Sequence, residues 1–227
     1  MSVSSLISSP FHVRGKHVLP GFALSLGISL LFVSLVLLLP LSGLLVQTAG
    51  MGWQEYWAVV TDARVLASYR VTLSMALIAA LLNGVIGLLL AWVLVRYQFP
   101  GKRLLDALID LPFALPTAVA GITLATLFAN GGWYGQWLEP LGIKVAYAPL
   151  GMMVAMLFTC LPFVVRNVQP VLEDLNASDE EAALSLGAAD WTVFWRVIFP
   201  AIRPALIMGV VLSLVRGLGE FGALIFI

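Results

Sequence analysis

Long apolar stretches alternate with short polar ones along most of the 227-residue chain. A helix needs about 20 consecutive apolar residues to cross a bilayer, because each residue advances it by only about 1.5 Å. Five stretches are long enough, and each is bounded by charges, glycine, proline or tryptophan. They cover, approximately, residues 21–46, 69–95, 108–130, 148–165 and 204–227. The pattern therefore predicts an all-α, polytopic membrane protein with five spans.

Prolines lie inside two of these stretches, Pro112 and Pro116 in the third and Pro162 near the end of the fourth. A proline frees one helical carbonyl, but spanning helices tolerate this where neighbouring helices or water satisfy that carbonyl. We therefore expect both stretches to cross the membrane.

The first 20 residues precede the first span and carry Arg14 and Lys16. Basic residues before an apolar run are also typical of a signal peptide. The run here exceeds the roughly 7–15 apolar residues of such peptides, and no small-residue cleavage site follows it. We expect residues 1–20 to form a cytoplasmic N-terminal segment and residues 21–227 a transmembrane domain whose first span is an uncleaved anchor.

Basic residues favour one orientation, since they gather in cytoplasmic loops. With the N-terminus inside, eight are cytoplasmic: Arg14, Lys16, Arg96, Lys102, Arg103, Arg166, Arg196 and Arg203. Three are then outside: Arg64, Arg70 and Lys144. The aromatic residues of the two outer loops fit this orientation as interfacial anchors, with contact to an external partner as the alternative: Trp53, Tyr56, Trp57, Trp133, Tyr134, Trp137 and Tyr147.

Composition excludes several classes of protein. Hydrophobic residues make up 61% of the chain and charged residues 11%, whereas soluble domains carry about 25% charged residues. The net charge is zero, so nothing predicts binding to nucleic acid. Cys160 is the single cysteine and cannot form an internal disulfide, and potential metal ligands do not cluster near it. We expect neither a metal nor a cofactor.

The longest cytoplasmic loop, residues 169–203, has the features of two short helices. Ser178 and Glu181 have the spacing of a capping box, and Gly187 is a plausible helix stop. Asp190 then caps a second helix that Pro200 ends. The first helix is slim at its alanines and could enter a groove on another protein. The alternative, a helix resting on lipid, usually carries Lys and Arg rather than three acidic residues.

This loop resembles that of permease subunits of ABC importers, whose pattern is E-A-A-x3-G-x9-I-x-L-P. Val197 replaces the isoleucine and Phe199 the leucine; the matching residues are Glu181, Ala182, Ala183, Gly187 and Pro200. The resemblance implies a coupling loop, about residues 167–203, whose helix docks into a cytoplasmic ATPase. It also implies a non-catalytic subunit, and the chain has no phosphate-binding loop of the G-x-x-x-x-G-K-[ST] type.

The last predicted span contains two charged residues, Arg216 and Glu220, four positions apart on one helical face. A charge at the bilayer centre costs about 2.5–3.5 kcal/mol on insertion scales, so such residues pair or line a watery path. Two interpretations remain open and are compatible. The pair holds helices together, or it lines or gates a translocation path together with Ser213 and Gly219.

The segment Arg216–Ala223 resembles the R-x-L-G-E-F-G-A signature of oxyanion permeases, the sulfate/thiosulfate and molybdate group. Residues 110–124 (DLPFALPTAVAGITL) and 161–175 (LPFVVRNVQPVLEDL) are similar to the sulfate branch. The resemblance implies the type I ABC importer transmembrane fold and a subunit of an ATP-driven sulfate/thiosulfate importer in a bacterial inner membrane. Its implied partners are a sister permease, two ATPase copies and a periplasmic sulfate- or thiosulfate-binding protein. A permease for molybdate or tungstate is the alternative.

The chain departs from this family in one respect, because the family has six spans and residue 227 falls at the end of the fifth. We expect a five-span chain to assemble poorly with its partners. Other classes fit less well. A secondary transporter often shows paired repeats, an intramembrane enzyme needs reactive groups at depth, and a purely structural subunit needs no docking loop. His12 and His17 lie near the N-terminus, away from the spans.

Overall fold

The computed structural model describes residues 21–227, which are helical and contain no strand. They divide into two compact units at the Asp62–Ala63 bond. The expectations for residues 1–20, including a cytoplasmic N-terminal segment and the surroundings of His12 and His17, lie outside the described residues.

The described part of the first unit is a helical rod followed by a short helix. The rod is continuous for 28 residues through α1 (Phe22–Val33), a π turn (Ser34–Leu38) and α2 (Leu39–Ala49). Pro40 falls in the first turn of α2, directly after the wide π turn, so its missing N–H does not break the helix. No side chain of the rod is buried, which suits a helix in lipid. The short helix is α3 (Trp53–Val60).

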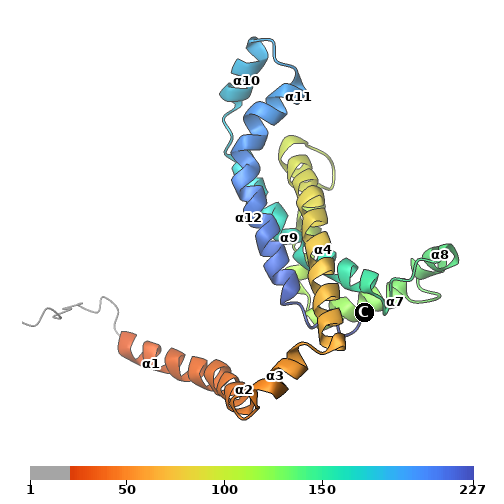
Figure 1. The fold of residues 1–227 in the computed structure, drawn as a ribbon. Helices are drawn as coiled ribbons and strands as arrows, with labels where there is room; N and C mark the ends of the chain where they lie inside the picture. The colour runs from red at the N-terminus through yellow and green to blue at the C-terminus, as the bar shows by residue number, and fades with distance from the viewer. Residues whose placement is uncertain (1–20) are drawn as a thin grey trace, which may run out of the picture. The chain divides into compact units, whose positions relative to one another are not determined.

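The second unit is built around three long helices that lie side by side, α4 (Ala63–Arg96), α9 (Pro149–Glu173) and α12 (Phe199–Leu218) (Figure 1). Glycines bring their backbones together. A Cβ atom at Gly87 would lie 2.7 Å from the Val164 side chain, and one at Gly209 would lie 2.9 Å from the Val164 Cα. Small residues at such contacts are typical of packed membrane helices.

The third predicted span is not one helix. The chain forms α5 (Lys102–Ile109), α6 (Leu111–Ala114) and α7 (Thr117–Phe128). Leu115 takes an extended conformation, with φ −87° and ψ 136°, because the ring of Pro116 disfavours a helical residue before it. The 12 residues of α7 reach about 18 Å, less than the roughly 30 Å of a hydrocarbon core.

One uninterrupted helix over residues 108–130 is therefore not formed. Four helices of the described residues are long and apolar enough to cross: Phe22–Ala49, Ala63–Arg96, Pro149–Glu173 and Asp190–Leu218. The broken segment nevertheless runs antiparallel along α9. Phe113 packs edge-on against Phe163, with ring centroids 5.2 Å apart, and further on Ala125 shares a buried cluster with Ala155.

The last long helix begins earlier and ends earlier than predicted. It runs without a break through α11 (Asp190–Val193), a π turn (Phe194–Ile198) and α12. Pro200 does not end a helix, because it sits in the first turn of α12 immediately after the π turn. The predicted span 204–227 stops at Leu218, and residues 219–227 form turns rich in glycine, a poor helix former.

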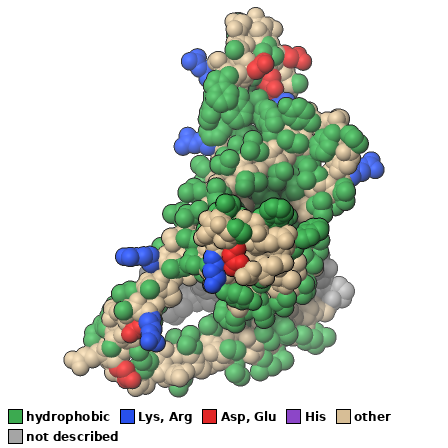
Figure 2. Space-filling view, turned by 90° about the vertical axis from the view of Figure 1, so that its right-hand side faces the viewer, with side chains coloured by type: hydrophobic (Ala, Val, Ile, Leu, Met, Phe, Trp, Pro, Cys, Tyr) green, Lys and Arg blue, Asp and Glu red, His purple; other side chains and the backbone are tan. Residues whose placement is uncertain are grey.

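Shorter helices lie at the two ends of the second unit. α8 (Gly135–Leu138) and a 3₁₀ turn (Glu139–Leu141) lie between α7 and α9, and α10 (Ala177–Ser185) lies between α9 and α11 at the other end (Figure 1). Hydrophobic side chains cover most of the visible surface between these ends (Figure 2). An apolar surface of this extent is expected of a protein that faces lipid.

Candidate functional site

The helix α10 ends at Gly187 as predicted. Gly187 has a φ of +83°, a left-handed conformation that residues with a Cβ rarely adopt. The N–H groups of Gly187 and Ala188 donate to the carbonyl oxygens of Leu184, at 2.9 Å, and Ala183, at 3.1 Å. These bonds satisfy carbonyls that would otherwise be unpaired at the end of the helix.

The predicted capping box at the start of α10 does not form. The helix begins at Ala177, with Asn176 as its N-cap and no side-chain capping bond. The Asp179 N–H donates to the Asn176 carbonyl at 3.2 Å, so the first turn closes ahead of Ser178 and places this serine inside the helix. The second predicted cap is also wrong by one residue, since Ala189, not Asp190, precedes α11 as its N-cap.

One flank of α10 packs on the helix bundle and the other is free. Ala183 is half-buried against the main hydrophobic core, whereas Glu181, Ala182 and Gly187 are exposed. Leu186 is 89% exposed. A bare leucine beside small and acidic side chains is typical of a surface that another protein covers. Pro200, the last residue of the family pattern, is also exposed, at the start of α12.

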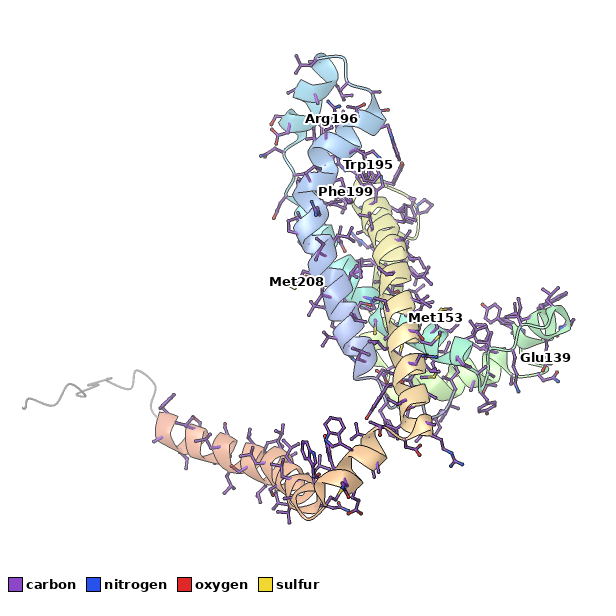
Figure 3. The ribbon with its side chains drawn as sticks, in the orientation of Figure 1. Glu139, Met153, Trp195, Arg196, Phe199 and Met208 are labelled. Atoms are coloured by element: carbon purple, nitrogen blue, oxygen red, sulfur yellow. The ribbon has the colours of Figure 1, made fainter. Side chains whose placement is uncertain are left out.

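Aromatic side chains form a cluster in and around the π turn that follows α11. The rings of Trp195 and Phe199 lie 4.8 Å apart at the start of the last long helix (Figure 3). Phe194 contacts Trp195 on one side at 5.2 Å and Trp92 of α4 on the other at 5.4 Å, both edge-on. Edge-to-face contacts at such distances are favourable, so the cluster fixes the π turn against α4.

A salt bridge joins α10 to the same helix. The Arg96 guanidinium, on the last residue of α4, pairs with the Glu180 carboxylate. The Arg96 guanidinium also lies 5.2 Å from the centre of the Trp92 ring, a cation–π distance. These groups line a cleft between α4, α10 and α11.

Arg216 and Glu220 meet as predicted, although Glu220 lies beyond the end of α12. The Arg216 guanidinium pairs with Glu220 Oε2, and Glu220 Oε1 accepts the Ala223 N–H at 3.0 Å. The Glu220 side chain is 1% exposed and that of Arg216 35%. The glutamate thus ties the end of the helix to the turn that follows, while part of the arginine faces the surroundings.

The turn after α12 packs closely on α7. A Cβ at Gly222 would lie 2.2 Å from Thr117 Oγ1, and one at Gly121 would lie 2.4 Å from the Ala223 carbonyl oxygen. Ala223 is fully buried. The glycine and alanine of the signature therefore have a packing role here, since larger side chains do not fit.

The other two candidate path residues do not join this pair. Ser213 is buried between helices, where its Oγ accepts from Asn83 Nδ2 of α4 at 3.2 Å. Asn83 Oδ1 is buried and has no hydrogen-bond partner. Gly219 is exposed at the end of α12. The structure thus brings together Arg216 and Glu220 and places Ser213 at a helix contact.

A charged cluster that the sequence analysis missed lies where α5 meets α9. Arg166 donates two hydrogen bonds to the Asp110 carboxylate, of 2.8 and 2.6 Å, and one each to the carboxylate and the backbone carbonyl of Asp106, of 2.8 and 3.1 Å. Its guanidinium also donates to Gln169 at 2.7 Å. Asp106 lies in the short amphipathic helix α5 and Asp110 directly after it, and this spacing of four residues could have indicated a shared partner. The cluster fixes α5 to α9.

Groups for redox or metal chemistry are not gathered in the part of the chain that the structure describes. Within residues 21–227, no set of three or more His, Cys, Asp and Glu side chains could hold a metal ion. Cys160 is a free thiol, buried in the bundle. The arrangement offers charged and apolar surfaces for binding.

Comparisons with known proteins give consistent results. Residues 83–227 match the family described as "Binding-protein-dependent transport system inner membrane component". The chain is 61% identical over 217 residues to the sulfate transport system permease protein CysT of Escherichia coli K12, covering 96% of this chain and 78% of that protein. It is 61% identical over 215 residues to CysT of Salmonella typhimurium, covering 95% and 78%. For CysT of Synechocystis the values are 48% over 200 residues, 88% and 70%.

Proposed function

Since the chain belongs to the family of binding-protein-dependent transport system inner membrane components, we propose that it is the permease subunit of an ATP-driven importer of sulfate or thiosulfate. The observation that carries this proposal is the likeness to sulfate permeases along almost the whole chain. The helical fold, with four helices apolar and long enough to span a bilayer, supports it.

The exposed flank of α10 is the proposed contact with a cytoplasmic ATPase. Glu181, Ala182, Leu186 and Gly187 are free of contacts that would bury them in the bundle. Small side chains allow a groove to close around the helix, and Glu181 offers charge for orientation. The permease then carries out no chemistry itself, and the energy of ATP hydrolysis reaches it through this loop.

The proposed assembly contains further subunits. A second, sister permease completes the path, two copies of an ATPase bind on the cytoplasmic side, and a periplasmic protein delivers the anion. The chain is a multi-pass protein of the inner membrane. Its proposed orientation has the N-terminus in the cytoplasm, which the excess of basic residues in the inner loops supports.

Other substrates and mechanisms are less well supported. The relatives named above are described as sulfate permeases, which favours sulfate over molybdate or tungstate. A transporter driven by an ion gradient is disfavoured by the match to a binding-protein-dependent family.

Arg216 is the proposed anion contact within the path. Its guanidinium is partly exposed at the end of α12, whereas its partner Glu220 is buried. A partly exposed arginine within an apolar span suits a path for a dianion, because its positive charge lowers the cost of bringing negative charge to that depth.

The test of the proposed function is uptake of labelled sulfate into proteoliposomes that contain the assembled transporter. Uptake should require both internal ATP and the external binding protein, and should persist when proton and sodium gradients are collapsed. Excess thiosulfate should compete, and excess molybdate should compete weakly. Uptake that follows an ion gradient and ignores ATP would overturn the proposal.

A further inference from the structure

The end of α4 contacts both α10 and the π turn before α12 through side chains. The Arg96 guanidinium pairs with Glu180 of α10 and lies over the Trp92 ring. The Trp92 ring in turn packs edge-on against Phe194, which belongs to the π turn before α12. Arg96 therefore contacts α10 directly and, through Trp92, the segment that follows it.

The chain connectivity makes these contacts important. α10 is linked through the backbone to α9 on one side and to α11 and α12 on the other. α4 lies far away in sequence, since Arg96 and Glu180 are 84 positions apart. A displacement of α10 can therefore reach α9 and α12 through the backbone, whereas α10 and α4 are joined directly by the Arg96–Glu180 ion pair.

Because the ion pair is partly buried, the attraction between its charges is stronger than in a fully exposed pair. The side chains of Arg96 and Glu180 are 29% and 21% exposed, and both lie in a cleft lined with apolar groups such as Leu184 and Val193. Exclusion of water strengthens the attraction between charges, and the stacked ring restricts the guanidinium to one place. Asp190 also faces this cleft, so negative charge surrounds the arginine on two elements.

We infer that Arg96 is a positioning residue for coupling, which ties α10 to α4 so that movement of the loop by the ATPase displaces α4 as well. This inference rests on the proposed function. It adds a direct contact by which α4 follows α10, beside the packing of α4 on α9 and α12.

The experiment uses charge exchange in the assembled transporter. The variants are Arg96→Glu, Glu180→Arg and the double exchange, with Arg96→Lys as the conservative change. Two controls carry the same change of charge on exposed residues outside α10, Arg203→Glu and Asp174→Arg. The measured quantities are sulfate uptake, and ATP hydrolysis with and without loaded binding protein.

Each single reversal should lower the uptake per ATP hydrolysed by about five-fold, as expected when an attractive pair becomes a repulsive one. The double exchange should restore most of it, and Arg96→Lys should fall between. The two controls should stay near the unchanged protein, and all variants should be recovered in the assembled complex in equal amounts.

Full uptake per ATP in both single reversals, or losses in the double exchange as large as in the singles, would overturn the role of Arg96. Such a result leaves the proposed function intact as long as the unchanged protein still imports sulfate with ATP. Failure of the unchanged protein to do so would instead overturn the proposed function.

Discussion

At the scale of single residues, the backbone conformation at position 187 favours glycine, whereas steric crowding does not. Its φ is +83°, yet a Cβ at this position would meet nothing within 4 Å. A left-handed conformation costs a residue with a Cβ about 1–2 kcal/mol, and asparagine tolerates it best. The glycine of the family pattern therefore sets the direction in which the chain leaves α10, next to the exposed Leu186.

Substitutions at Gly187 should separate conformation from size. Gly187→Val should reduce ATP hydrolysis stimulated by the loaded binding protein about ten-fold, because the altered turn displaces the docking surface. Gly187→Asn should retain most of it, although asparagine also places a side chain in the open space beside the turn. Stimulated ATPase activity of the purified complex measures both. Equal losses in the two variants would show that the open space beside the glycine is what matters.

At the scale of elements, sequence patterns identified most helices and misplaced several ends. The long apolar runs located α4 and α9 well, since burial and lipid contact both demand apolar residues there. The break between α6 and α7 was missed because prolines are compatible with spanning helices, and only the extended Leu115 reveals the interruption. Continuation of the last helix through Pro200 was missed because a π turn leaves no clear signal in sequence.

The end of α12 combines a structural role and a proposed path role, and one pair of substitutions can separate them. Arg216→Met with Glu220→Gln removes both charges, while the glutamine can still accept the Ala223 N–H. We expect sulfate uptake to fall about ten-fold or more, because the positive charge proposed for the path is gone.

The unfolding temperature of the purified protein in detergent is measured alongside uptake. It should change little, since Glu220→Gln preserves the hydrogen bond that ties the helix to its turn. Retained uptake would leave the pair with its structural role alone. A marked fall in the unfolding temperature would point to packing as the cause of lost uptake.

At the scale of the whole molecule, the residues proposed for docking and those proposed for the path lie at opposite ends of the second unit. Glu181 and Gly187 belong to the loop at one end of the last long helix, and Arg216 and Glu220 to the other. Resemblance identified these residues and helical spacing paired the last two. Neither the resemblance nor helical spacing could predict the tertiary contacts. Arg166 and Asp110, like Arg96 and Glu180, are brought together only by folding.

The proposed orientation predicts which exposed residues face each side of the membrane. In a protein whose buried Cys160 is changed to alanine, Trp137→Cys should react with a membrane-impermeant maleimide applied to spheroplasts. In cells that lack the ATPase proposed to cover it, Leu186→Cys should react only after the membrane is permeabilised. Both native side chains are well exposed, at 73% and 89%. The reverse labelling pattern would place the N-terminus outside, against the distribution of basic residues.

The unbroken helix Asp190–Leu218 has a mechanical consequence. Its 29 residues span about 43 Å, so it is a stiff rod with the docking loop at one end and the arginine–glutamate pair at the other. If it pivots near either end, a tilt of about 5° moves the opposite end by about 4 Å, close to the width of a hydrated gap between side chains. In the proposed assembly, a lever of this length would let a small displacement of the α10 loop open or close a passage near the arginine–glutamate pair.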